Sequence, residues 1–81
     1  MADSSVLERL TPILREIFDS DDLVATADLT ADRVNGWDSL TNIRLFLAVE
    51  VEFELHFSAA EISGLMNVGE LADLIVKKQR R

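Results

Sequence analysis

The stretch VEVEFELHF, residues 49–57, alternates apolar and polar side chains, which is the pattern of a half-buried β-strand. No other segment of the 81 residues alternates in this way, so a strand here would have no partner, and a lone strand is not stable. Read as a helix, the same region gathers one apolar face, formed by Leu45, Phe46, Val49 and Phe53. We therefore predict a helix from about residue 39 to 54. The chain after it should turn into the core at Leu55 and Phe57.

Three other segments have helical patterns. Residues 4–18 place apolar side chains at helical spacing, namely Val6, Leu7, Leu10, Ile13, Leu14, Ile17 and Phe18. Ser58 with Glu61, and Asn67 with Glu70, are helix-start signals that predict a short helix ending at Gly64 and a last helix after residue 67. The sequence thus predicts an all-α fold, a four-helix bundle with a long first loop and a short third helix, in a single domain spanning residues 1–81.

The long loop, residues 19–37, has no sustained apolar period. We expect five side chains to hold it against the helices: Leu23, Val24, Leu29, Val34 and Trp37. A calcium loop of the EF-hand type is rejected because Leu23 and Val24 stand where oxygen ligands and a glycine would be needed.

The charge excludes one class of partner and favours another. The chain has 15 acidic and eight basic residues, and four of the basic ones lie in the last five positions. Such a surface repels nucleic acid and attracts a protein partner with a basic face. No apolar run approaches the length of a membrane span, no signal peptide pattern is present, and there is no cysteine. We expect a monomer in the cytoplasm, and we read the basic tail as a solvated helix end.

Most catalytic constellations are missing from the sequence. The single histidine, His56, and Ser39 would lie at opposite ends of one helix, about 24 Å apart, so they cannot form a nucleophile–base pair. Glu50 and Glu54 would be helix neighbours on an open, solvated face rather than a pair of catalytic acids. No metal site is expected, and the chain is not expected to be an enzyme.

The dipeptide Asp38-Ser39 admits two compatible readings. Asp38 is a favoured N-cap residue, with Ser39 as the first residue of the helix. A helix N-terminus also presents unpaired N–H groups and a partial positive charge, so a phosphate bonded to Ser39 would be stabilised there. On the dipeptide alone, the first reading is the stronger one.

The wider context resembles the acyl carrier protein family over nearly the whole chain. The resemblance is centred on the Asp-Ser-Leu motif, here Asp38, Ser39 and Leu40. It is supported by the acid-rich end of the second helix, the short third helix, and the last-helix pattern Val68, Leu71 and Ile75. It implies that a phosphopantetheinyl transferase attaches phosphopantetheine from coenzyme A to Ser39. The thiol of that arm would carry acyl groups as thioesters, loaded and used by ligase, synthase or transferase enzymes.

Departures from the fatty-acid form favour a specialised lipid or secondary-metabolite pathway. Trp37 precedes the motif, and Thr41 to Arg44 replace the acids that usually follow the serine. We expect partners to bind a stripe on the helix face away from the core, together with nearby acids: Leu40, Arg44, Leu47, Glu50, Val51 and Glu54. Packing of Leu47 and Val51 under the first loop is the alternative for this stripe. For the whole protein, the alternative is an unmodified acidic helical protein-interaction module.

Overall fold

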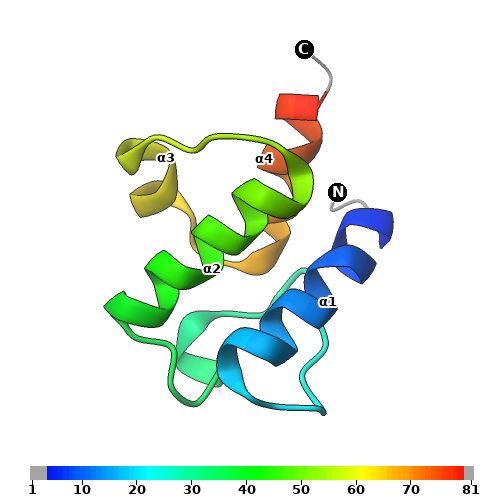
Figure 1. Cartoon of the computed structure of the whole chain (residues 1–81), viewed down its shortest axis with the longest axis vertical. Coiled ribbons are helices and arrows are strands. Elements are labelled where there is room, and N and C mark those ends of the chain that lie inside the picture. The colour runs from blue at the N-terminus through cyan, green and yellow to red at the C-terminus, as the bar shows by residue number, and fades with distance from the viewer. Residues whose placement is uncertain (1–3, 80–81) are drawn as a thin grey trace.

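Helices make up the regular structure of this protein. The computed structural model describes residues 4–79, in the order α1 (Ser4–Phe18), the 3₁₀ helix η1 (Ala31–Arg33), α2 (Ser39–Phe53), α3 (Ala59–Gly64) and α4 (Val68–Gln79) (Figure 1). No strand occurs within this range, and residues 49–53 of the alternating stretch are helical as predicted. Its last residue differs, because Glu54 leaves the helix in the left-handed conformation, with φ 56°.

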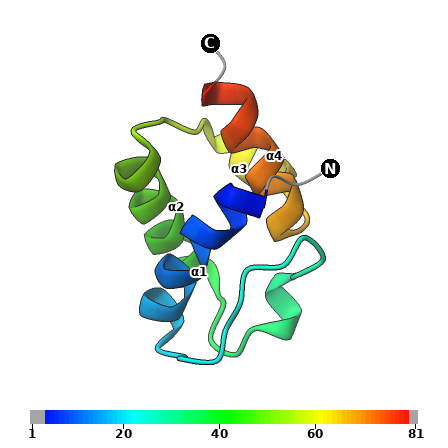
Figure 2. The same cartoon turned by 90° about the vertical axis from the view of Figure 1, so that its right-hand side faces the viewer.

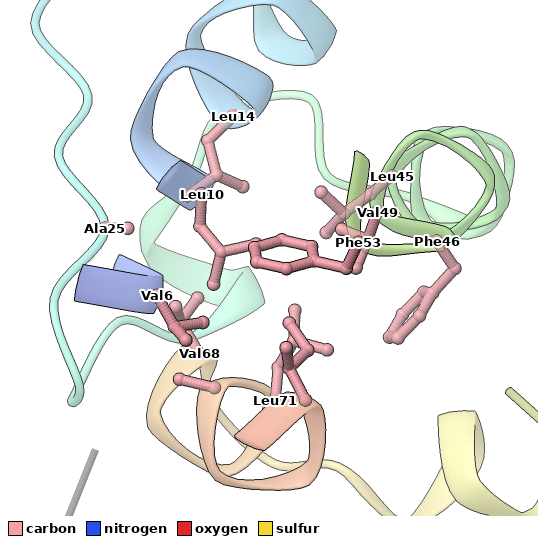
Figure 3. Packing of buried hydrophobic residues seen from close by; sticks show 12 residues of the cluster. Val6, Leu10, Leu14, Ala25, Leu45, Phe46, Val49, Phe53, Val68 and Leu71 are labelled. Atoms are coloured by element: carbon pink, nitrogen blue, oxygen red, sulfur yellow. The ribbon is translucent and has the colours of Figure 1, made fainter. Parts of the chain in front are cut away.

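The core is built where α1, α2 and α4 meet. The face predicted for α2 is buried, and Figure 3 shows the Phe53 ring between side chains of α1 and α4. α1 contributes Val6, Leu10 and Leu14, whereas Ile17, expected in the same stripe, is half-buried and lies outside the core cluster. α4 contributes Val68, Leu71, Ala72 and Ile75. α1 therefore packs against both of the other long helices, as the turned view in Figure 2 shows.

The long loop is bound to the start of α4 by two backbone hydrogen bonds. The N–H of Val68 donates to the carbonyl of Leu29, and the N–H of Gly69 donates to that of Ala27, each at 2.9 Å. A Cβ on Gly69 would lie 2.6 Å from the Ala27 carbonyl oxygen, so only glycine permits this approach. Val24, expected to anchor the loop, is instead half exposed, and its neighbour Ala25 is buried.

The short helix α3 has no buried residue of its own. Ile62 packs half-buried against the core, and so does Leu65, which follows the helix. Ser58 and Glu61 form the predicted capping box at its start. Lys78 of α4 is not the solvated tail residue we expected: its side chain is largely covered and reaches Glu61 at 3.0 Å. α3 is therefore held by the Lys78–Glu61 ion pair and by a small number of apolar contacts.

Candidate functional site

The start of α2 is closed by reciprocal hydrogen bonds. The Asp38 carboxylate accepts the N–H groups of Leu40 and Thr41, both at 3.0 Å, while the Thr41 hydroxyl accepts the Asp38 N–H at 2.8 Å. The hydrogen bond from the Thr41 N–H is the largest cause that holds the pKa of Asp38 below its usual value. Asp38 is thus an ionised N-cap, as predicted, and its carboxylate is turned toward the helix backbone.

Ser39 is the first residue of α2, and it is exposed. Among residues 4–79, no group forms a hydrogen bond with its hydroxyl. The adjacent helix end carries a partial positive charge, which suits an attached phosphate. The hydroxyl is therefore accessible to another protein, and it makes no hydrogen bond that stabilises the fold.

The loop before Ser39 is pinned by an aromatic contact and a side-chain hydrogen bond. The chain turns at Gly36, whose φ of 89° is readily adopted by glycine and rarely by other residues. The Trp37 ring then packs against Phe18 at a tilt of 34°, with 5.0 Å between ring centroids, and its indole N–H donates to Oδ1 of Asn42 at 3.0 Å. This bond ties the loop to the first turns of α2 and fixes the position from which Ser39 is presented.

A small cavity lies beside this loop, between α2, the region of α3 and the start of α4. Its volume is about 80 Å³, and its lining is mostly apolar. The lining residues include Trp37 and Asn42 near Ser39, Phe46 of α2, Ile62 of α3 and Asn67 ahead of α4. Asn42 lies one helical turn from Ser39, so a group attached to Ser39 is close to this cavity.

The outward face of α2 carries the predicted stripe. Leu40 is 61% exposed, Leu47 57% and Val51 80%, and Arg44 and Glu54 are exposed as well. The alternative packing of Leu47 and Val51 under the first loop is therefore wrong. Ile43, 58% exposed, belongs to the same surface and was not predicted. Ile43 lies three residues after Leu40 and four before Leu47, and this helical spacing could have predicted that it shares their face.

The prediction for Glu50 was wrong in its exposure. It was expected on a solvated face, but its side chain is only 20% exposed. Its carboxylate accepts the N–H of Phe57 at 2.9 Å and lies 3.8 Å from the His56 ring nitrogen. Glu50 closes the turn after α2, while Glu54 at the same end is exposed.

Ser39 begins α2 and His56 lies in the turn after its other end, so the two are far apart, as the sequence indicated. Within residues 4–79, no cluster of three or more histidine, cysteine or acidic side chains could hold a metal ion. None of the helices in this range has the length and apolar character of a membrane span.

Comparisons with known proteins find similar chains among the solved structures. No protein-family model matches the sequence, and no curated protein matches it. Among solved structures, the chain is similar to the solution structure of a holo acyl carrier protein from Geobacter metallireducens. The sequences are 42% identical, the TM-score is 0.88, and the match covers 94% of this chain and 87% of that one.

Proposed function

This chain belongs to the acyl carrier protein family, and we propose that Ser39 is the residue that carries its phosphopantetheine arm. The observation that carries the proposal is the exposed, unengaged Ser39 hydroxyl at a capped helix start within Asp38-Ser39-Leu40. The arm, once attached, supplies a thiol that holds an acyl group as a thioester.

The residues around Ser39 fit a phosphate-linked group. The Asp38 carboxylate accepts hydrogen bonds from the backbone N–H groups of Leu40 and Thr41, so its charge is compensated by the helix start. The partial positive charge of the helix N-terminus favours a phosphodiester at this position. Because Trp37 and Thr41 fix the loop and the first turn, a transferase meets the serine in one defined setting.

Partner enzymes are proposed to bind the outward face of α2. This face begins beside Ser39 and exposes Leu40, Ile43, Leu47 and Val51 in a row. Contiguous apolar side chains of this kind mark interaction surfaces. Arg44 lies within the row and Glu54 follows its end, and the two carry charges of opposite sign. The partners are a phosphopantetheinyl transferase and the enzymes that load and use the acyl group.

The chain is proposed to serve a specialised lipid or secondary-metabolite pathway rather than bulk fatty acid synthesis. Trp37 before the motif and Arg44 on the partner face support this, since both depart from the fatty-acid form. The chemistry would lie with the partner enzymes, so no catalytic residue is assigned here. The single domain, the monomeric state and the cytoplasmic location stay predictions.

Attachment can be tested by mass spectrometry. Incubation with a phosphopantetheinyl transferase and coenzyme A should add one arm to the wild-type chain and none to Ser39→Ala. Ser63→Ala, a matched change at another exposed serine, should be modified like the wild type. Normal modification of Ser39→Ala would contradict the assignment. An unmodified wild-type chain would favour the alternative of an acidic protein-interaction module.

A further inference from the structure

The turn ahead of α2 is held on both sides by one hydroxyl group. The N–H of Trp37 donates to the carbonyl of Val34 at 3.3 Å, which closes a four-residue turn with Gly36, φ 89°, at its third position. The Thr41 hydroxyl, in the first turn of α2, accepts the N–H of Asp38 at 2.8 Å. The same hydroxyl donates to the carbonyl oxygen of Gly36, also at 2.8 Å. One side chain thus bridges the two residues on either side of Trp37.

The proton of the Thr41 hydroxyl has one acceptor nearer than the others. The carbonyl and carboxylate oxygens of Asp38 both lie at 3.2 Å, against 2.8 Å for the Gly36 carbonyl. The shorter distance is the usual one for a hydroxyl hydrogen bond to oxygen. The hydroxyl therefore accepts from the chain after the turn and donates to the chain before it.

Threonine does something here that the usual capping residue cannot do. In a capping box, the third helical residue is typically a glutamate or glutamine that accepts the N–H of the N-cap residue. A carboxylate has no proton to donate, so an acid at position 41 would leave the Gly36 carbonyl without this hydrogen bond. Thr41 therefore closes the helix start and also fastens the preceding turn to it.

The backbone around Ser39 is fixed, while the serine side chain is not. Asp38, the residue before it, is held at its N–H by Thr41 and at its carboxylate by the N–H groups of Leu40 and Thr41. The Ser39 hydroxyl makes no hydrogen bond with residues 4–79. Holding a reacting group in one orientation accelerates the chemical step. Loss of such an interaction lowers the rate of that step, whereas loss of a contact used only for binding weakens affinity.

From this arrangement we infer that Thr41 is a positioning residue for the transfer of phosphopantetheine to Ser39. Its hydroxyl holds the turn and the start of α2 in the orientation in which a transferase meets the serine. This role rests on the proposed attachment at Ser39. It makes Thr41 set the rate of the attachment step, separately from the exposed α2 face that is proposed to bind the transferase.

The step that Thr41 would accelerate is a substitution at phosphorus. The Ser39 oxygen forms a bond to the phosphorus that carries the pantetheine, and the pyrophosphate bond of coenzyme A breaks. The adenosine bisphosphate part leaves with the electron pair of that bond. The serine proton passes to a base of the transferase. Thr41 touches none of these reacting atoms and acts through the orientation of Ser39.

Thr11 of α1 offers a chemically matched control. Its hydroxyl donates to the carbonyl of Leu7 at 3.1 Å and accepts the N–H of Ala25 at 3.0 Å. It too fastens the long loop to a helix, but at Ala25 and not in the turn that precedes Ser39. Removing either threonine hydroxyl therefore removes two hydrogen bonds from the fold, and only the loss at Thr41 acts on that turn.

Single-turnover transfer separates positioning from binding. An excess of phosphopantetheinyl transferase with coenzyme A would modify each chain, at a temperature at which circular dichroism shows it fully folded. The limiting rate reports the orientation of Ser39, and the half-saturating transferase concentration reports binding. Thr41→Val keeps the side-chain shape and loses both hydrogen bonds, so the limiting rate should fall by at least about fivefold. The half-saturating concentration should stay close to that of the wild type.

Three further variants assign the effect to the two hydrogen bonds. Thr41→Ser keeps a hydroxyl and should restore the wild-type rate. Thr41→Asp keeps an acceptor for the Asp38 N–H and a favourable charge at the helix start, but it has no proton for Gly36. It should stay folded and still lose rate, including at high salt, where exposed charges are screened. Thr11→Val should lose stability and keep the wild-type rate.

Several results would overturn this role of Thr41. They are a wild-type limiting rate in Thr41→Val or Thr41→Asp, a slow Thr41→Ser, and equal slowing of Thr41→Val and Thr11→Val. A Thr41→Val defect confined to the half-saturating concentration would also contradict it, because Thr41 would then act in binding. In each case the wild-type chain still gains its arm, so the proposed function stands. A wild-type chain that gains no arm contradicts the proposed function, and the role of Thr41 fails with it.

Discussion

Lys78 of α4 and Glu61 of α3 form an ion pair with 3.0 Å between Nζ and Oε1. The same carboxylate oxygen accepts the N–H of Ser58 at 2.9 Å, and the Lys78 ammonium lies 5.5 Å from the centre of the Phe57 ring. Because α3 has no buried residue, this junction is a further contact that holds it, besides the packing of Ile62 against the core. α3 also borders the cavity through Ile62.

The position of α3 should depend on pH. The Ser58 N–H and, after it, Lys78 hold the pKa of Glu61 below its ordinary value of 4.5. A lowered folded-state pKa stabilises the fold above pH 4.5, and this contribution is lost as the pH falls through the folded-state value. The protection factors of amides in residues 59–64, which correct for the intrinsic slowing of exchange in acid, should therefore fall below pH 4.5, ahead of those in α1 and α2.

Variants assign this effect to the Glu61 carboxylate. Glu61→Gln should have lower protection factors in residues 59–64 at neutral pH, and these should lose most of their change below pH 4.5. Lys77→Met, on the exposed side of the same helix turn as Lys78, should behave like the wild type. An unchanged pH profile in Glu61→Gln would remove the carboxylate from the explanation.

Phe53 is the side chain of α2 whose loss should cost most. It is 6% exposed, lies in the core between α1 and α4, and carries the Arg9 guanidinium 4.2 Å from its ring centre. Phe53→Ala should lower the free energy of unfolding by roughly 3–5 kcal/mol. Val51→Ala, two residues away and 80% exposed, should change it by no more than about 0.5 kcal/mol. Urea denaturation of both variants measures the difference, and similar losses would contradict the assignment of the two faces.

Much of the helical arrangement could be predicted because it depends on neighbours in sequence. Asp38, Ser58 and Asn67 cap the helices they precede, and each acts on N–H groups two or three residues away. Predicting a helix for the alternating stretch required one further observation. No other segment of the sequence alternates, so a strand there would have no partner.

The features that could not be predicted join residues that are not helix neighbours. Glu50 accepts the Phe57 N–H only because Glu54 turns the chain back in the left-handed conformation. Lys78 meets Glu61 from another helix, and a charge near the chain end gives no sign of this. In the site, the sequence pattern around Ser39 and along the outward stripe was enough to predict both. The cavity could not be predicted, because it forms only where α2, the loop and α4 pack together.

Gly69 should tolerate no side chain. Its backbone approaches Ala27 so closely that an added Cβ would lie 2.6 Å from a carbonyl oxygen, and the hydrogen bond beside it holds the long loop. Gly69→Ala should cost roughly 1–3 kcal/mol of unfolding free energy through this clash. Gly64→Ala is the matched control, because nothing lies within 4 Å of its Cβ position. That control should be neutral or stabilise by up to about 1 kcal/mol. A thermal melt in which both variants match the wild type would show that the loop moves away freely.

Arg44 should determine which enzymes use this carrier. It is exposed in the middle of the outward α2 stripe, between Leu40 and Leu47, and it is a basic residue on a chain whose net charge is −7. A partner adapted to this chain should offer an acid or a neutral group at that point, while an enzyme adapted to acidic carriers offers a base. Like charges placed opposite each other exclude wrong partners.

Arg44→Glu should therefore weaken use by the native partner and improve use by fatty-acid synthase enzymes. Both effects should shrink as salt is raised, because the interacting charges are exposed. The measurement is the rate of loading or turnover of the phosphopantetheine-bearing wild type and variant with each enzyme set. Lys77→Glu makes the same change in net charge on α4, away from the stripe, and should alter neither rate by a comparable amount. If Arg44→Glu and Lys77→Glu shift the two rates equally, total charge rather than this position governs recognition.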